Sequence, residues 1–333
     1  MKTFNAIDIT RVIAAILVIC VHTDPLYHYS EASNYFIVSV LARLAVPFFF
    51  VTSGFFFGKK ISLEKKQFED LPKLLSMLKR LATLYFIWSI MYLPLQFYSW
   101  LNSNRNMGYW LTYLQKAIFE GSYYTLWYLV GLIVALFVSY LLFKLFKPRL
   151  VLLLSFILFV IGTLFQSYYE VWSQMAWFDW YYNFFLTTRN GLFFGTFFVS
   201  LGIFLAHTRR NFTLQANITL FVVTFLLLTF EAFNMMNSEF PKGSGMWIML
   251  GPTVLFLFLG LKRLRLPTKH YYKYTRPISF LMYVSHGLFM IVFSHIFEIN
   301  SLLYFLVILL LTAVFSVLIV VLSKKYPILY KLY

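Results

Sequence analysis

The chain has 333 residues, of which 61% are hydrophobic, 22% aromatic and 12% charged. Soluble globular domains hold ~45–50% apolar and ~25% charged residues, so the composition excludes that class and predicts an integral membrane protein. The formal charge of +16 would suggest nucleic-acid binding in a soluble chain. Cytoplasmic loops of membrane proteins also collect Lys and Arg, so we expect no nucleic-acid partner.

Ten apolar segments follow one another along the chain, each close to the ~20 residues that a helix needs to cross a bilayer. They lie at 6–23, 34–57, 75–98, 125–146, 150–168, 190–207, 214–234, 244–261, 277–297 and 302–323. The predicted fold class is therefore an all-α, polytopic membrane bundle of about ten transmembrane helices. No repeat or linker divides residues 1–333, so we expect a single integral-membrane domain.

The connecting loops differ in charge on alternate sides of this bundle. Most Lys and Arg follow the second, fourth, sixth and eighth segments or lie in the C-terminal tail. Because cytoplasmic loops are enriched in these residues, both termini are predicted to be cytoplasmic. The lysine-rich loop 59–73 is predicted to form either a short interfacial helix or, as the favoured alternative, simply a solvated face. Residues 99–124 contain an amphipathic pattern suited to a helix on the outer surface. The aromatic loop 167–188 is either an interfacial belt or a platform for carbohydrate.

The first segment is the strongest candidate for chemistry because it carries Asp8, Arg11 and His22. An eleven-residue separation in a helix puts Arg11 and His22 within ~20° of the same face and ~16 Å apart along the axis. Ionisable groups inside a bilayer cost roughly 2.5 kcal/mol or more, which indicates a function. A histidine can act as a general base, and an arginine can bind an anion. The structural alternatives are a packed histidine and an Arg11–Asp8 ion pair.

Further polar groups lie in other segments. Arg43 precedes Pro47 and the small Ser53–Gly54 pair, which would let another helix approach closely. Lys79 and Arg80 begin the third segment, where they either reach back to the interface or bind phosphate. Glu231 is a candidate counter-charge for a buried arginine. The remaining candidates are Arg189, Tyr283 and His286. No metal-ligand spacing, phosphate loop or nucleophile elbow occurs, so no metal is expected.

These residues resemble the acyltransferase 3 family of integral membrane O-acyltransferases. The resemblance is carried by Arg11-x10-His22, by FFFVTSGFFF, by the start of the third segment, by LWYLVGLIVALF (126–137) and by SFLMYVSHGLF (279–289). It covers essentially the whole chain. The segments LARLAVPFFFVTSGFFF and TRNGLFFGTFF (188–198) are most similar to the membrane domain of vancomycin-resistance serine racemases.

The resemblance implies an enzyme of the bacterial plasma membrane that uses acyl-CoA, here expected to be acetyl-CoA, as donor substrate, with no permanently bound cofactor. The acceptor would be a cell-surface glycan or lipid-linked sugar, with membrane lipids around the bundle. Carried over, His22 would be the catalytic base and Arg11 a catalytic or donor-positioning group. Lys79, Arg80 and Arg43 would contact CoA. The acceptor would be bound by Tyr283, His286, Trp127 and Arg189.

The chain departs from the family pattern at two positions. Family members often carry Arg-x-x-Arg in the third segment, but Thr83 holds the second place here, with Lys79 as a substitute. Thr125 stands where a histidine often precedes the Leu-Trp-Tyr-Leu run. Two other functions stay open: a transporter of a small polar solute such as serine, and a partner subunit for export of a surface polymer. A transporter would be expected to show inverted repeats, and we find none.

Overall fold

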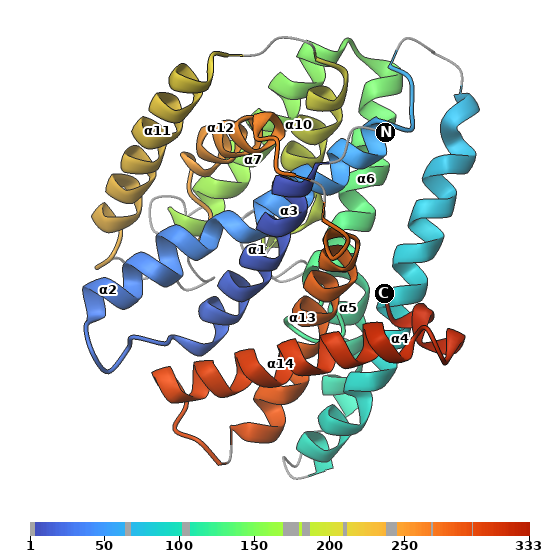
Figure 1. Ribbon diagram of the computed structural model, residues 1–333, viewed down its shortest axis with the longest axis vertical. Helices are drawn as coiled ribbons and strands as arrows, with labels where there is room; N and C mark the ends of the chain where they lie inside the picture. Colours follow the sequence, from blue (N-terminus) through green and yellow to red (C-terminus); the bar gives the residue numbers. More distant parts are fainter. Residues whose placement is uncertain are drawn as a thin grey trace. The chain divides into compact units, whose positions relative to one another are not determined.

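The computed structural model describes residues 4–333 apart from 64–67, 102–106, 169–179, 182–186, 209–211, 238–244, 268 and 295. Every regular element within these described residues is a helix (Figure 1). Helices satisfy all backbone hydrogen bonds within one segment, which is why apolar chains adopt them in lipid. The all-α class predicted from the sequence is confirmed.

All ten predicted segments coincide with helices, and eight of these are long and apolar enough to span a membrane among the described residues. The two shorter ones are the sixth and the eighth. The sixth is a π-helical turn, η4 (Gly191–Gly195), continued by α10 (Thr196–His207). The eighth is α12 (Leu250–Arg263), which is shortened because residues 245–249 do not form a helix.

Glu231 explains where α12 begins. Its carboxylate accepts hydrogen bonds from the backbone N–H groups of Ile248 (2.7 Å) and Met249 (2.8 Å), and from the Tyr168 hydroxyl (3.0 Å). The first N–H groups of a helix have no partner within the helix, and a carboxylate there also complements the helix dipole. Glu231 therefore caps the start of α12, a role that differs from the predicted counter-charge.

The chain forms two compact units that interleave along the sequence. The first comprises residues 1–45, 81–129 and 265–333, and the second comprises 46–80 and 130–264. Because each unit draws on distant parts of the chain, neither is a sequential domain. The expectation of a single domain over residues 1–333 stays a prediction.

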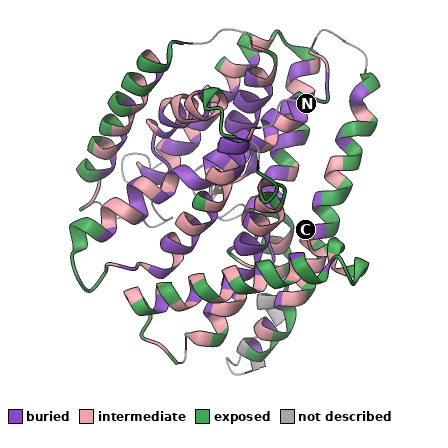
Figure 2. Cartoon of the chain, in the orientation of Figure 1, coloured by how far each residue is buried: buried purple, intermediate pink, exposed green. Residues whose placement is uncertain are grey.

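In the first unit, α13 (Tyr272–Phe293) packs against both α1 (Asn5–Thr23) and α14 (Leu302–Leu322). Short turns η1 (Phe36–Leu41) and η2 (Ala42–Leu44) also pack on α1. The buried residues of α14 repeat every four positions: Tyr304, Ile308, Thr312, Ser316 and Val320. The rest of α14 is mostly exposed or intermediate (Figure 2). One stripe of this apolar helix therefore faces protein, and the remainder suits lipid.

The remaining elements of the first unit are α2 (Glu31–Tyr35), α5 (Met107–Phe119), the terminal 3₁₀ turns η5 (Pro327–Leu332) and the larger part of α4 (Leu71–Leu101). A helix predicted within 99–124 is confirmed as α5, and its place on the outer surface stays a prediction.

The second unit contains α3 (Ala45–Gly58), α6 (Trp127–Leu145) from Val130 on, α7 (Pro148–Ser167), η4, α10, α11 (Leu214–Asn234) and α12. Its helices approach closely at glycines. A Cβ on Gly54 of α3 would lie 2.3 Å from the Val199 carbonyl oxygen of α10. A Cβ on Gly202 would lie 2.1 Å from the Val51 oxygen. The predicted close approach at Ser53–Gly54 is therefore confirmed.

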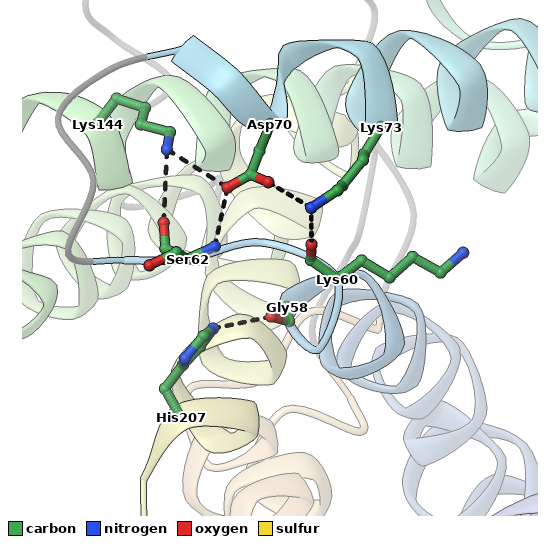
Figure 3. Close-up of polar contacts among 7 residues, drawn as sticks. All are labelled: Gly58, Lys60, Ser62, Asp70, Lys73, Lys144 and His207. Carbon is green, nitrogen blue, oxygen red and sulfur yellow. Dashed lines mark hydrogen bonds and ion pairs between the residues drawn. The ribbon is translucent and has the colours of Figure 1, made fainter. Parts of the chain in front are cut away.

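Figure 3 shows a polar network that ties the loop after α3 to its neighbours. Asp70, in the 3₁₀ turn η3 (Phe68–Asp70), accepts hydrogen bonds from Lys73 Nζ (2.6 Å) and the Ser62 N–H (2.9 Å). Lys144 Nζ, at the end of α6, lies 3.9 Å from the same carboxylate. Two lysines from separate helices therefore share one buried acidic group.

The interfacial helix predicted for the loop 59–73 stays a prediction, because only part of this loop is described. It consists of turns over 59–63, the 3₁₀ turn η3 and the start of α4, while residues 64–67 lie outside the described part. Asp70 and the backbone carbonyl of Lys60 fix the Lys73 side chain at this point. The predicted aromatic belt or platform at 167–188 falls largely outside the described residues.

Candidate active site

Arg11 and His22 lie on one uninterrupted helix, α1. The helix ends just after His22, where Asp24 adopts a left-handed conformation with φ 43° and its N–H bonds to the Cys20 oxygen. Ala14, Ala15, Val18 and Ile19 between them are buried. The helix predicted from the Arg11-x10-His22 spacing is confirmed, and it keeps both groups on one face as the geometry requires.

His22 contacts two rings from other parts of the first unit. Its ring centre lies 5.3 Å from that of His286 on α13, with an interplanar angle of 26°. The Tyr124 ring, from the segment before α6, lies 5.2 Å away. Tyr124 is 48% exposed and His286 is 0% exposed. His22 therefore contacts one exposed ring and one fully buried ring.

His286 is held in a defined orientation. Its Nδ1 lies 2.6 Å from the backbone oxygen of Tyr283, one turn earlier on α13. A carbonyl oxygen can only accept, so Nδ1 carries the proton and Nε2 of the neutral ring is a hydrogen-bond acceptor. Nε2 is buried and has no hydrogen-bond partner among the described residues. Buried polar atoms without partners are rare in native proteins, and each calls for an explanation.

The segment that carries Tyr124 is anchored to α13. The Tyr283 hydroxyl donates to the backbone oxygen of Thr125. The Tyr92 hydroxyl donates to the Val284 oxygen (2.8 Å) and lies 3.3 Å from the Thr125 hydroxyl. These bonds come from α4, α13 and the turn before α6, so they fix the position of Tyr124 relative to the two histidines.

Two stacked tyrosines, Tyr92 and Tyr123, lie next to Tyr124. The Tyr123 ring stacks on the Tyr92 ring with ring centres 4.6 Å apart, and its centre lies 4.4 Å from that of Tyr124. Burial raises the pKa of the Tyr123 hydroxyl, and the neighbouring Tyr124 raises it further. Tyr123 therefore stays protonated over the physiological range, so it adds no negative charge near His22.

Arg11 lies in a charged environment at the other end of α1. The groups that interact with it electrostatically are Asp8, Arg276 and Tyr128. Arg276 of α13 donates to both oxygens of Asp8, at 2.7 and 3.1 Å. The Tyr128 ring lies 5.4 Å from that of Tyr283. Arg11 thus shares a neighbourhood with an acidic group that is already engaged by a second arginine.

The structure gathers some predicted site residues in the first unit and places others in the second. Arg11, His22, Tyr283 and His286 come together on α1 and α13. Arg43 lies in η2, which packs on α1, and Trp127 begins α6, both in the first unit.

Lys79 and Arg80 are exposed residues of α4 in the second unit, and Arg189 precedes η4 in the same unit. Their predicted contacts with CoA and with the acceptor stay predictions. Within the described residues, no group of three or more His, Cys, Asp or Glu could hold a metal ion.

Sequence reasoning did not single out Tyr124, Tyr128, Tyr92 or Arg276 as site residues. Tyr128 lies inside the Leu-Trp-Tyr-Leu run, and Arg276 directly precedes the segment that carries His286. Proximity to those motifs was therefore the available signal. Tyr92 and Tyr124 sit among many aromatic residues and carry no distinguishing pattern. Only the packing of α4 and α13 sets them apart.

Comparison with known proteins agrees with this arrangement of motifs. The model of the acyltransferase 3 family, described as an acyltransferase domain, matches residues 4–321. The chain belongs to the acyltransferase 3 family. With eight helices in its described part that are long and apolar enough to cross a bilayer, it is a multi-pass membrane protein. No solved structure gives a significant match.

The similar curated proteins are enterococcal racemases. One amino-acid racemase of Enterococcus faecalis is 31% identical over 262 residues, which is 77% of this chain and 35% of that protein. A second from the same species is 28% identical over 332 residues, which is 96% of this chain and 46% of that protein. A serine/alanine racemase of Enterococcus gallinarum is 28% identical over 290 residues, which is 85% of this chain and 40% of that protein. The chain spans less than half the length of these relatives.

Proposed function

We propose that this protein is an O-acyltransferase of the bacterial plasma membrane. It moves an acetyl group from cytoplasmic acetyl-CoA to a hydroxyl of a cell-envelope glycan or lipid-linked sugar outside the membrane. The observation that carries the proposal is the position of His22 in a chain of this family. It lies on the same helical face as Arg11 and is flanked by the accessible Tyr124 and the buried His286.

His22 is the general base in this proposal. As the acceptor hydroxyl oxygen attacks the thioester carbonyl carbon, the hydroxyl proton passes to His22. The carbon–sulfur bond then breaks, the electron pair leaves with sulfur, and the imidazolium returns the proton to the CoA thiolate. The products are the acetyl ester and CoA with a free thiol, so atoms and charge balance. A positioned base of this kind typically contributes 10²–10⁴-fold in rate.

Arg11 is the donor-side group in this proposal. A guanidinium offers a planar set of donors that suits phosphate or a developing oxyanion, and it keeps its charge at physiological pH. With the termini on the cytoplasmic side, as the loop charges predict, Arg11 is nearer the cytoplasm than His22. Lys79, Arg80 and Arg43 are the further CoA contacts that we propose.

The deciding experiment uses the full chain reconstituted in nanodiscs with acetyl-CoA and a panel of polyols or cell-envelope fractions. Release of the CoA thiol and mass-spectrometric detection of an acetylated acceptor would support the proposal if both are lost in His22→Ala. The variant must retain the thermal unfolding transition of the wild type. A wild-type protein that neither binds acetyl-CoA nor forms an ester would overturn the proposal.

Uptake of a small polar solute is the second candidate, because the similar proteins are named for racemisation of amino acids and of serine and alanine. Proteoliposomes containing the same purified chain test it directly. Accumulation of labelled serine without thioester turnover would favour transport over acyl transfer.

A further inference from the structure

His286 carries the feature that the proposed reaction leaves unexplained. The reaction needs one base, yet a second imidazole stacks on His22 with ring centres 5.3 Å apart. Its Nδ1 is occupied by the Tyr283 oxygen, while its Nε2 is fully buried and has no partner among the described residues. An unpaired buried acceptor costs about 1–3 kcal/mol, so a group kept in this state suits a ligand that supplies a donor.

The ring is neutral, which fixes the kind of group it can take. A charged imidazolium in a fully buried position would need a counter-ion, and the Tyr283 carbonyl supplies only partial charge. Nε2 therefore offers a lone pair and no hydrogen. Its ligand must present an O–H or N–H group. A carboxylate, a carbonyl or an ether oxygen would meet a second acceptor.

The distance between the two rings limits where that donor lies on the ligand. Hydrogen-bonded heavy atoms are ~2.7–3.0 Å apart, so two donors on neighbouring carbons can each reach one ring of a pair whose centres are 5.3 Å apart. Tyr124 is exposed, His22 is partly buried and His286 is fully buried. The group next to the reacting hydroxyl is therefore the one that reaches deeper.

We propose that His286 Nε2 binds a second donor of the acceptor substrate, and that the substrate class is a 1,2-diol or a 1,2-amino alcohol. This inference rests on the proposed acyl transfer, because it assigns the reacting hydroxyl to His22. His286 is in this view a substrate-binding residue that selects among acceptors. Ser285, the neighbouring residue on α13, has a second buried hydroxyl without a partner among the described residues, and this supports a ligand at this level of the helix.

The experiment compares matched acceptors with the full chain in nanodiscs and acetyl-CoA. Trans-1,2-cyclohexanediol offers the second donor, and cyclohexanol lacks it. We expect the wild type to favour the diol about tenfold per hydroxyl in kcat/KM, which corresponds to about 1.4 kcal/mol. In His286→Phe, which keeps an aromatic ring beside His22, that preference falls to near unity.

Two further variants separate binding from packing. His286→Gln returns a neutral acceptor near the Nε2 position and should restore part of the preference for the diol. His28→Gln changes a half-exposed histidine near Glu298 and should leave the preference unchanged. A preference that persists in His286→Phe, or a wild type that does not distinguish the two acceptors, would overturn the inference.

Binding provides a readout that does not need turnover. The wild type should be stabilised against thermal unfolding more by the diol than by cyclohexanol at equal concentration, and His286→Phe should lose that difference. If acetyl transfer is absent but this difference is found, the proposed function is wrong and the ligand class stands. If transfer occurs and the difference is absent in both readouts, the ligand class is wrong and the proposed function stands.

Discussion

Arg276 donates both hydrogen bonds of a bidentate pair to Asp8 and so ties the start of α13 to the start of α1. This pair sets the register between the two helices that carry the two histidines. Asp8 is nearly buried, whereas the Arg276 side chain is about half exposed. The pair also places a second cation beside Arg11.

The Asp8–Arg276 pair should contribute to the stability of the first unit. Asp8→Asn keeps the side-chain shape but removes the charge, and we expect it to lower the free energy of unfolding by about 1–2 kcal/mol. Thermal unfolding in detergent, followed by tryptophan fluorescence, measures the change. Arg276→Lys should lower the free energy of unfolding by less than Asp8→Asn does. Lysine keeps the positive charge but cannot form the bidentate contact. A variant as stable as the wild type would show that the pair is energetically neutral.

His22 should be essential for acyl transfer and dispensable for folding. Loss of a general base typically costs 10²–10⁴-fold in rate, so His22→Ala should reduce turnover of acetyl-CoA by at least about 100-fold. His207→Ala is the matched control, since that ring contacts the Gly58 oxygen in the second unit. Equal losses in both variants would point to a general effect of removing a histidine.

Arg11 should act mainly on the donor. Arg11→Ala is expected to reduce kcat/KM for acetyl-CoA strongly, and Arg11→Lys to retain more activity through its charge while losing planar recognition. Steady-state kinetics with varied acetyl-CoA at saturating acceptor gives the two constants. If KM for the acceptor alone changes, the assignment of Arg11 to the donor is incorrect.

Asp70 should hold the end of the second unit together. Its carboxylate is shared by Lys73 and by the nearly buried Lys144. Asp70→Asn removes the negative charge that faces Lys144, and removal of one partner from a buried pair costs about 3–5 kcal/mol. The 3.9 Å distance to Lys144 places the expected loss at the lower end of that range. Glu69→Gln, one residue earlier and exposed, serves as the control in the same thermal assay.

Gly54 should not tolerate a methyl group. In a helix interior, alanine is ordinarily favoured over glycine by about 1 kcal/mol. Here the added Cβ would lie 2.3 Å from the backbone oxygen of Val199, so α3 and α10 must separate. Gly54→Ala is therefore expected to destabilise the protein, opposite in sign to the propensity. At Gly260 the one near atom that the described part of the chain provides is the end of the Asn217 side chain, so Gly260→Ala should be milder.

Hydropathy predicted the positions of all ten helical segments because long apolar runs have few alternatives in lipid. It could not predict that residues 245–249 stay non-helical, since that depends on the Glu231 carboxylate reaching the start of α12. The spacing of Arg11 and His22 placed them on one face because helix geometry is local.

The partners of these two residues were harder to predict. The stacking of His286 on His22 and the pairing of Arg276 with Asp8 depend on contacts between the two ends of the chain. A single sequence gives no signal for such distant pairs. The charge pattern of the loop at 59–73 likewise gives no signal for the individual hydrogen bonds through which Asp70 organises it.

The interleaving of the first unit also affects how this protein is made. α1 is synthesised before the intervening helices, whereas α13, which carries His286, follows all of them in the sequence. Until α13 is synthesised the nascent α1 must reside in the membrane with Asp8 lacking the arginine that later neutralises it. Chaperone or insertase contacts during biogenesis would therefore be expected at α1, and any chain cut short before residue 272 would lack an assembled centre.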